Sequence, residues 1–81
     1  MTSPEIDRTV YLRLTRAEAL VLFEWLARVD AAKNLPVEDP AEEQVLWRLE
    51  GQLESALLEP LGPNYKEAVE AARKEVRGSQ Q

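Results

Sequence analysis

Residues 15–26 decide the fold of this chain; they read TRAEALVLFEWL. Thr15 and Glu18 have the spacing of a capping box, in which the hydroxyl and the carboxylate bond reciprocally with amides of the first helical turn. The apolar residues that follow recur at helical spacing and form a wide stripe, with Trp25 on its flank. The stretch therefore predicts a helix that runs to about Ala32 and contacts neighbours on two sides, which favours burial of Trp25.

Two further helices follow. Asn34 is the expected left-handed residue behind the first helix. Asp39 then precedes a proline, the typical N-cap and first position of a helix. We expect the second helix over about residues 40–58 and the third over about residues 63–76, each with its own apolar stripe.

Residues 8–14 predict a strand. Their side chains alternate between two faces, an apolar one with Val10, Leu12 and Leu14 and a mixed one with Thr9, Tyr11 and Arg13. Strict alternation is typical of a half-buried strand. No second strand is readable in the chain, so a partner strand must come from another copy or another protein. Otherwise the segment runs extended over the helices without pairing. The residues expected to pair are Thr9, Val10, Tyr11, Leu12 and Arg13.

The expected fold is mainly α, a short N-terminal strand followed by a three-helix irregular antiparallel bundle. The 81 residues make a single helical domain over 8–77, with disordered tails at 1–7 and 78–81. A core of this size supplies little stability, and the chain has no cysteine for disulfides. A second subunit is a common remedy, so we also consider a homodimer.

No secretory signal or membrane span is expected. The first seven residues are polar and lack a basic segment followed by an apolar run. The longest apolar run, residues 19–23, is far too short to span a bilayer. We therefore expect a soluble, cytoplasmic protein.

The residue types argue against catalysis. The chain has neither His nor Cys, and it has no glycine-rich phosphate loop. Paired carboxylates exist, at Glu42 with Glu43 and at Glu50 with Glu54, but three short helices rarely enclose the cleft that would tune them. We expect no enzymatic activity, no catalytic residues, no metal site and no cofactor.

The charge is segregated. Seven acids and one base lie between Glu38 and Glu59, whereas acids and bases nearly balance elsewhere in a chain of net charge −5. The acids at the start of the second helix suit its macrodipole. Glu50, Glu54 and Glu59 lie mid-helix or near the C-terminal end, where the dipole disfavours them. They form either a solvated face or a surface that meets a partner.

The candidate partner-binding surface lies on the second helix. Trp47 falls off the apolar stripe and beside the acids, where it is either the rim of a small core or an interface anchor. The residues expected to bind a partner are Glu43, Trp47, Glu50, Glu54 and Leu58.

The order strand–helix–helix resembles ribbon–helix–helix DNA-binding antitoxins, in which paired strands of a dimer enter the major groove. That resemblance implies that Thr9, Tyr11 and Arg13 face the bases. The acidic chain and the acids at the start of the second helix disfavour binding to nucleic acid.

Three runs carry a second resemblance; they read LTRAEALVLFEWL (14–26), EQVLWRLE (43–50) and LEPLGPNY (58–65). Together they are similar to small, acidic, uncharacterised bacterial proteins, over most of the chain from Val10 to Arg77. The resemblance implies a bacterial cytosolic protein and carries no catalytic residue.

The expected function is that of a non-enzymatic protein-binding module, similar in size and charge to immunity proteins and antitoxins. It would neutralise a basic partner, such as a toxin nuclease, through the acidic surface of the second helix. The alternatives are a ribbon–helix–helix-like DNA-binding regulator and a structural homodimer.

Overall fold

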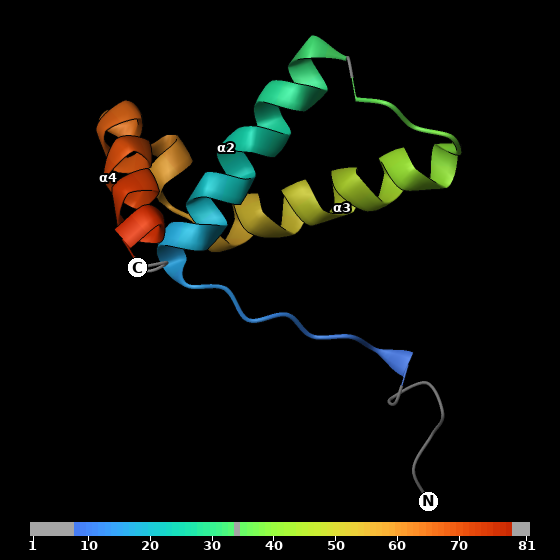
Figure 1. Cartoon of the computed structure of the whole chain (residues 1–81), viewed down its shortest axis with the longest axis horizontal. Helices are drawn as coiled ribbons and strands as arrows, with labels where there is room; N and C mark the ends of the chain where they lie inside the picture. The colour runs from blue at the N-terminus through green and yellow to red at the C-terminus, as the bar shows by residue number, and fades with distance from the viewer. Residues whose placement is uncertain (1–7, 34, 79–81) are drawn as a thin grey trace, which may run out of the picture.

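The computed structural model describes residues 8–33 and 35–78. It contains helices α2 (Arg16–Ala32), α3 (Pro40–Ala56) and α4 (Tyr65–Gly78), with a short 3-10 helix, η1 (Glu59–Leu61), ahead of α4 (Figure 1). The predicted mainly helical class with three α-helices is confirmed. The expected tails at 1–7 and 79–81 lie outside the described residues, and Gly78 belongs to α4.

The capping box of α2 is confirmed. The backbone N–H of Thr15 donates to Glu18 Oε1 at 2.8 Å, and the N–H of Glu18 donates to Thr15 Oγ1 at 3.1 Å. At the other end Lys33 takes the left-handed conformation, with φ 54°, and its N–H bonds to the carbonyl of Val29. Asn34, the residue expected in that conformation, lies outside the described residues.

Helix α3 starts as predicted and ends early. Asp39 is its N-cap and accepts from the N–H of Ala41 at 2.8 Å, with Pro40 at the first position. The helix ends at Ala56, two residues before the predicted end, because the chain becomes extended at Leu57. No helix in the described part of the chain combines the length and the apolar character needed to cross a membrane.

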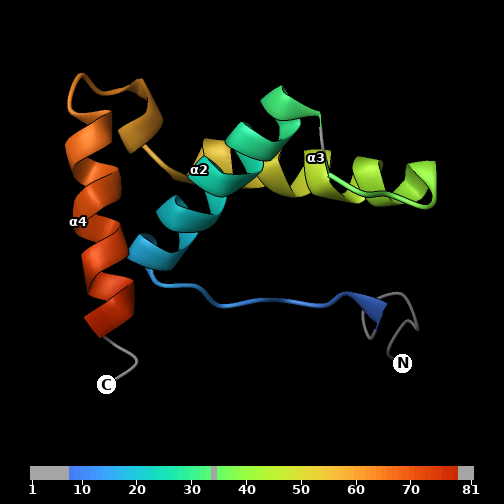
Figure 2. The same cartoon turned by 45° about the horizontal axis from the view of Figure 1, so that its top comes forward.

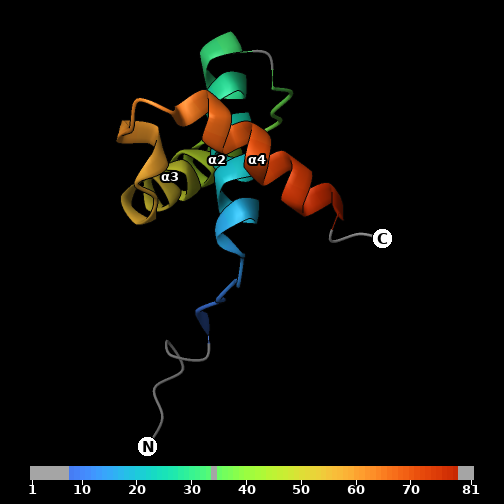
Figure 3. The same cartoon turned by 90° about the vertical axis from the view of Figure 1, so that its left-hand side faces the viewer.

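The core is small and centred on α2. Both α3 and α4 pack against this helix, and α4 crosses in front of it in Figure 3, whereas α3 and α4 share few contacts with each other. The two-sided packing predicted for α2 is therefore confirmed. Trp25, which was expected to gain from that packing, is 43% exposed. The buried side chains are Leu20, Phe23, Leu26, Leu53, Leu57, Val69 and Ala72.

The helices splay instead of lying side by side. The start of α2 lies near the end of α3, and the two diverge toward the loop that joins them (Figure 1). An open arrangement of this kind leaves the far ends of α2 and α3 available to line a surface groove.

The N-terminal strand is a wrong prediction. Residues 9–14 form no ladder with any described residue and run extended away from the helices (Figure 2). Val10, Tyr11 and Leu12 are 81%, 84% and 75% exposed. The alternation is present, but its apolar face has nothing to pack against in one chain. We call residues 8–14 the N-terminal arm.

The adjacent residues Leu57 and Leu58 provide a test of this core. Leu57 is 3% exposed and Leu58 is 74% exposed. Leu57→Ala is expected to lower the free energy of unfolding by about 2–4 kcal/mol, because it leaves a cavity in the core. Leu58→Ala, the matched control, is expected to change it by less than about 0.5 kcal/mol. Urea unfolding followed by circular dichroism measures both, and equal losses would contradict the described packing.

Candidate functional site

A groove opens where α2 and α3 diverge. Its volume is about 70 Å³, which is enough for a single side chain. Apolar residues form its walls and charged residues lie among them. We call it the α2–α3 groove; its lining residues are Leu26, Val29, Asp30, Lys33, Leu35, Glu43, Leu46, Trp47 and Glu50.

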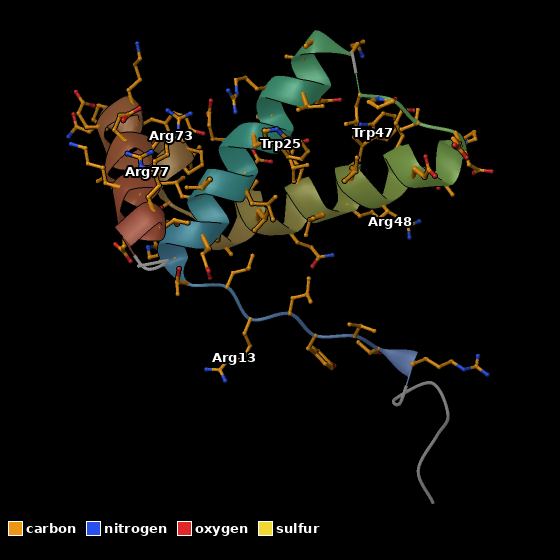
Figure 4. All side chains as sticks on the ribbon, viewed as in Figure 1. Arg13, Trp25, Trp47, Arg48, Arg73 and Arg77 are labelled. Atoms are coloured by element: carbon orange, nitrogen blue, oxygen red, sulfur yellow. The ribbon has the colours of Figure 1, made fainter. Side chains whose placement is uncertain are left out.

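Trp47 joins the two sides of the groove. Its indole Nε1 donates a hydrogen bond to Asp30 Oδ1 at 3.1 Å, from α3 to α2. The side chain lies on the α2-facing side of α3, with Arg48 on the opposite side (Figure 4). Trp47 is also 50% exposed. Half of this large side chain is therefore covered, and the other half remains available for a contact.

The predicted partner-binding acids share one face of α3. At about 100° per residue, Glu43, Glu50 and Glu54 all fall within about 60° of Trp47. Glu43 and Glu50 line the groove, and Glu54 follows one turn after Glu50. Within the described residues no hydrogen bond or ion pair reaches any of these three carboxylates. The structure thus brings together four of the five residues predicted from the sequence.

The acids of the groove repel one another. The pKa of Glu50 is raised above its ordinary value of 4.5, chiefly because burial penalises the charged form and also because Asp30 and Glu54 lie close by. Lys33 is the one cation in the groove lining. A positively charged group placed here would relieve this repulsion.

Two acids differ from the sequence-based interpretation. Glu59, counted there among the acids that lack a local explanation, makes a bidentate pair with Arg16, at 3.0 Å to Nη2 and 3.2 Å to Nε. Asp30 was not predicted, although it borders the groove. Its position near the C-terminal end of α2, where the helix dipole disfavours an acid, was the available signal.

The remaining predicted residues lie elsewhere. Leu58 is exposed, but it lies beyond the C-terminal end of α3 and does not line the groove. The arm residues expected to pair, from Thr9 to Arg13, are all exposed, and Arg13 points away from the helices (Figure 4). In one chain these residues therefore contribute nothing to the groove.

A second polar cluster is structural. The hydroxyl of Tyr65 donates to Glu24 Oε1 at 2.6 Å and ties α4 to α2. Burial, together with this hydrogen bond, raises the pKa of Tyr65. Glu24 also lies 3.6 Å from Arg28. Across residues 8–33 and 35–78 no three His, Cys, Asp or Glu side chains are placed to hold a metal ion.

The chain was compared with known proteins, and it matches no family model, no curated protein and no solved structure.

Glu50→Gln tests the repulsion in the groove. A carboxyl whose pKa is raised in the folded state binds protons more readily there than in the unfolded chain, so its charge destabilises the fold above its ordinary pKa. At pH 7 the free energy of unfolding of the variant is expected to exceed that of the unaltered protein by about 0.2–0.5 kcal/mol, the value typical of a like-charge pair four residues apart in a helix. This gain in stability should shrink as the pH falls toward about 4, because Glu50 then becomes protonated in both the folded and the unfolded state.

Urea unfolding of the two proteins at both pH values, at low protein concentration, measures this effect. Glu38→Gln is the control, since this exposed side chain lies in the loop ahead of α3 and outside the groove. A loss of stability at pH 7 in Glu50→Gln, or a gain that does not depend on pH, would count against repulsion at Glu50.

Proposed function

We propose that this protein is a non-enzymatic binding module, immunity-like or antitoxin-like, that neutralises a basic protein partner through the acidic face of α3. The observation that carries the proposal is the gathering of Glu43, Glu50 and Glu54 on the face of α3 that carries Trp47, where all but Glu54 line the groove. These carboxylates have no cationic partner among the described residues. They are therefore free to meet one on another protein.

Capture proceeds in two steps. The acidic face attracts a basic surface over several ångströms and raises the association rate, an effect that salt screens. The exposed half of Trp47 and the apolar groove walls then hold the docked partner, since a large aromatic side chain in a partly formed pocket is a typical binding anchor. Asp30 holds the Trp47 indole through its hydrogen bond, which limits the ordering cost on binding.

The DNA-binding alternative has less support. The N-terminus of α3 carries Glu42 and Glu43, which would repel phosphate. A structural homodimer is the second candidate, and the exposed apolar side chains of the arm favour it.

Neutralising the acidic face tests the proposal. Immobilised protein is used to capture binding proteins from a lysate of its host, and each captured protein is purified and its affinity measured. The triple variant Glu43→Gln, Glu50→Gln, Glu54→Gln is expected to bind at least about tenfold more weakly, mostly through a slower association rate. For the unaltered protein the affinity should fall steeply between low salt and physiological salt.

The matched control is Glu67→Gln, Glu70→Gln, Glu75→Gln on α4, which changes the net charge equally. It should bind as the unaltered protein does, because α4 lies away from the groove. If both triple variants bound equally well, or if affinity did not depend on salt, the acidic face of α3 would have no part in binding.

A further inference from the structure

The N-terminal arm has the chemistry of a ligand. It reads RTVYLRL, with two arginines and no acid, and its apolar side chains alternate along it. Val10, Tyr11 and Leu12 are almost fully exposed. Several large apolar side chains in a row on the surface of a small protein usually mark an interaction site.

The α2–α3 groove has the complementary chemistry. Its walls are apolar, and Asp30, Glu43 and Glu50 outnumber its single cation, Lys33. The arm is positive and apolar where the groove is negative and apolar. One chain therefore carries two surfaces of complementary charge, and they do not meet within that chain.

The chain geometry keeps Arg13 out of its own groove. The groove begins at Leu26, about 16 Å along α2 from the cap residue Thr15, at 1.5 Å per residue. Arg13 is two residues before Thr15, so its backbone reaches only about 7 Å from the helix start. In Figure 1 the arm leaves the start of α2 and runs below α3, whereas the C-terminal end of α2 lies above α3.

We propose that the N-terminal arm of one copy docks into the α2–α3 groove of a second copy, and that the exchange of two arms holds a symmetric dimer. In the docked arm, Leu12 contacts the apolar walls, and Arg13, on the opposite side of the extended chain, reaches the carboxylates at the rim. A two-fold dimer contains this contact twice. This goes beyond the proposed function, because the occupant is a second copy of this chain, and a basic partner would compete with the docked arm for the same groove.

A dimer in which the two arms pair with each other accounts for fewer of these features than docking of each arm in a groove. A two-stranded ribbon in water is marginally stable and leaves its apolar face exposed. It also brings the arginines of both arms together with no acid among them. Docking in the groove covers the apolar side chains and pairs the arginines with acids.

A charge exchange between arm and groove tests the proposal. Sedimentation equilibrium over a range of concentrations is expected to show a reversible monomer–dimer equilibrium for the unaltered chain. Arg13→Glu and Glu50→Arg should each raise the dimer dissociation constant by about tenfold or more. An equimolar mixture of the two variants should recover a dimer within about threefold of the original, because each arm then meets a groove of opposite charge.

Controls separate this contact from other effects. Arg77→Glu, at the exposed end of α4, makes the same charge change as Arg13→Glu and should leave the dimer unchanged. Circular dichroism checks that each variant folds; if Glu50→Arg does not, Glu43→Arg at an exposed position of the groove replaces it.

Three results would overturn the proposal. The chain could remain a monomer at every concentration, or the dimer could ignore both charge reversals. Alternatively, Arg13→Glu could weaken a dimer that Glu50→Arg and Glu43→Arg leave intact, which would indicate pairing between arms. None of these results bears on capture of a basic partner, which is measured with a separate protein and the triple glutamine variant.

Discussion

The apolar stripe of α2 supports the whole structure. Leu20, Phe23 and Leu26 lie on this helix, and both α3 and α4 pack against it while sharing little surface with each other. Apart from the contact between α4 and η1, α2 is the main packing partner of both outer helices. Both ends of α2 are closed by backbone or side-chain hydrogen bonds, from the capping box at Thr15 to the left-handed Lys33. Side-chain contacts at Arg16–Glu59 and at Tyr65–Glu24 then tie the later part of the chain to the same helix.

The divergence of α2 and α3 follows from the small number of buried contacts between them. Of the residues in α3, only Leu53 is buried, and it lies in the C-terminal half, so the N-terminal half is held less closely. The resulting space becomes the α2–α3 groove. The hydrogen bond between Trp47 and Asp30 bridges this groove. Glu50 lies partly buried in the groove, close to the like charges of Asp30 and Glu54. The limited burial of α3 thus both keeps the core small and opens the acidic groove.

Local signals in the sequence predicted the helices well. The capping box at Thr15 and the Asp39–Pro40 start depend only on neighbours a few residues away, and both were located correctly. The face of α3 that carries Glu43, Trp47 and Glu50 also followed from helical geometry. These features need no knowledge of tertiary structure.

Features that depend on distant residues were not predictable in this way. Alternation at residues 8–14 specifies a face but not a partner, so the strand prediction was wrong for the single chain. The Arg16–Glu59 pair joins positions far apart in the sequence, and Glu59 therefore looked unexplained. Asp30 lines the groove because α2 and α3 diverge toward their joining loop, and this divergence is a tertiary feature. The resemblances noted in the sequence have no counterpart among the known proteins compared.

The burial of one residue in α3 has a consequence for how this protein can change over generations. The exposed positions of this helix contribute little to folding, since α3 packs against the core through Leu53 and the partly buried Leu46 and Leu49. Substitutions at exposed positions such as Glu43 and Glu54 can therefore accumulate with little loss of the fold. Duplicated genes that share this scaffold could diverge in the surface they present while the packing around α2 stays constant.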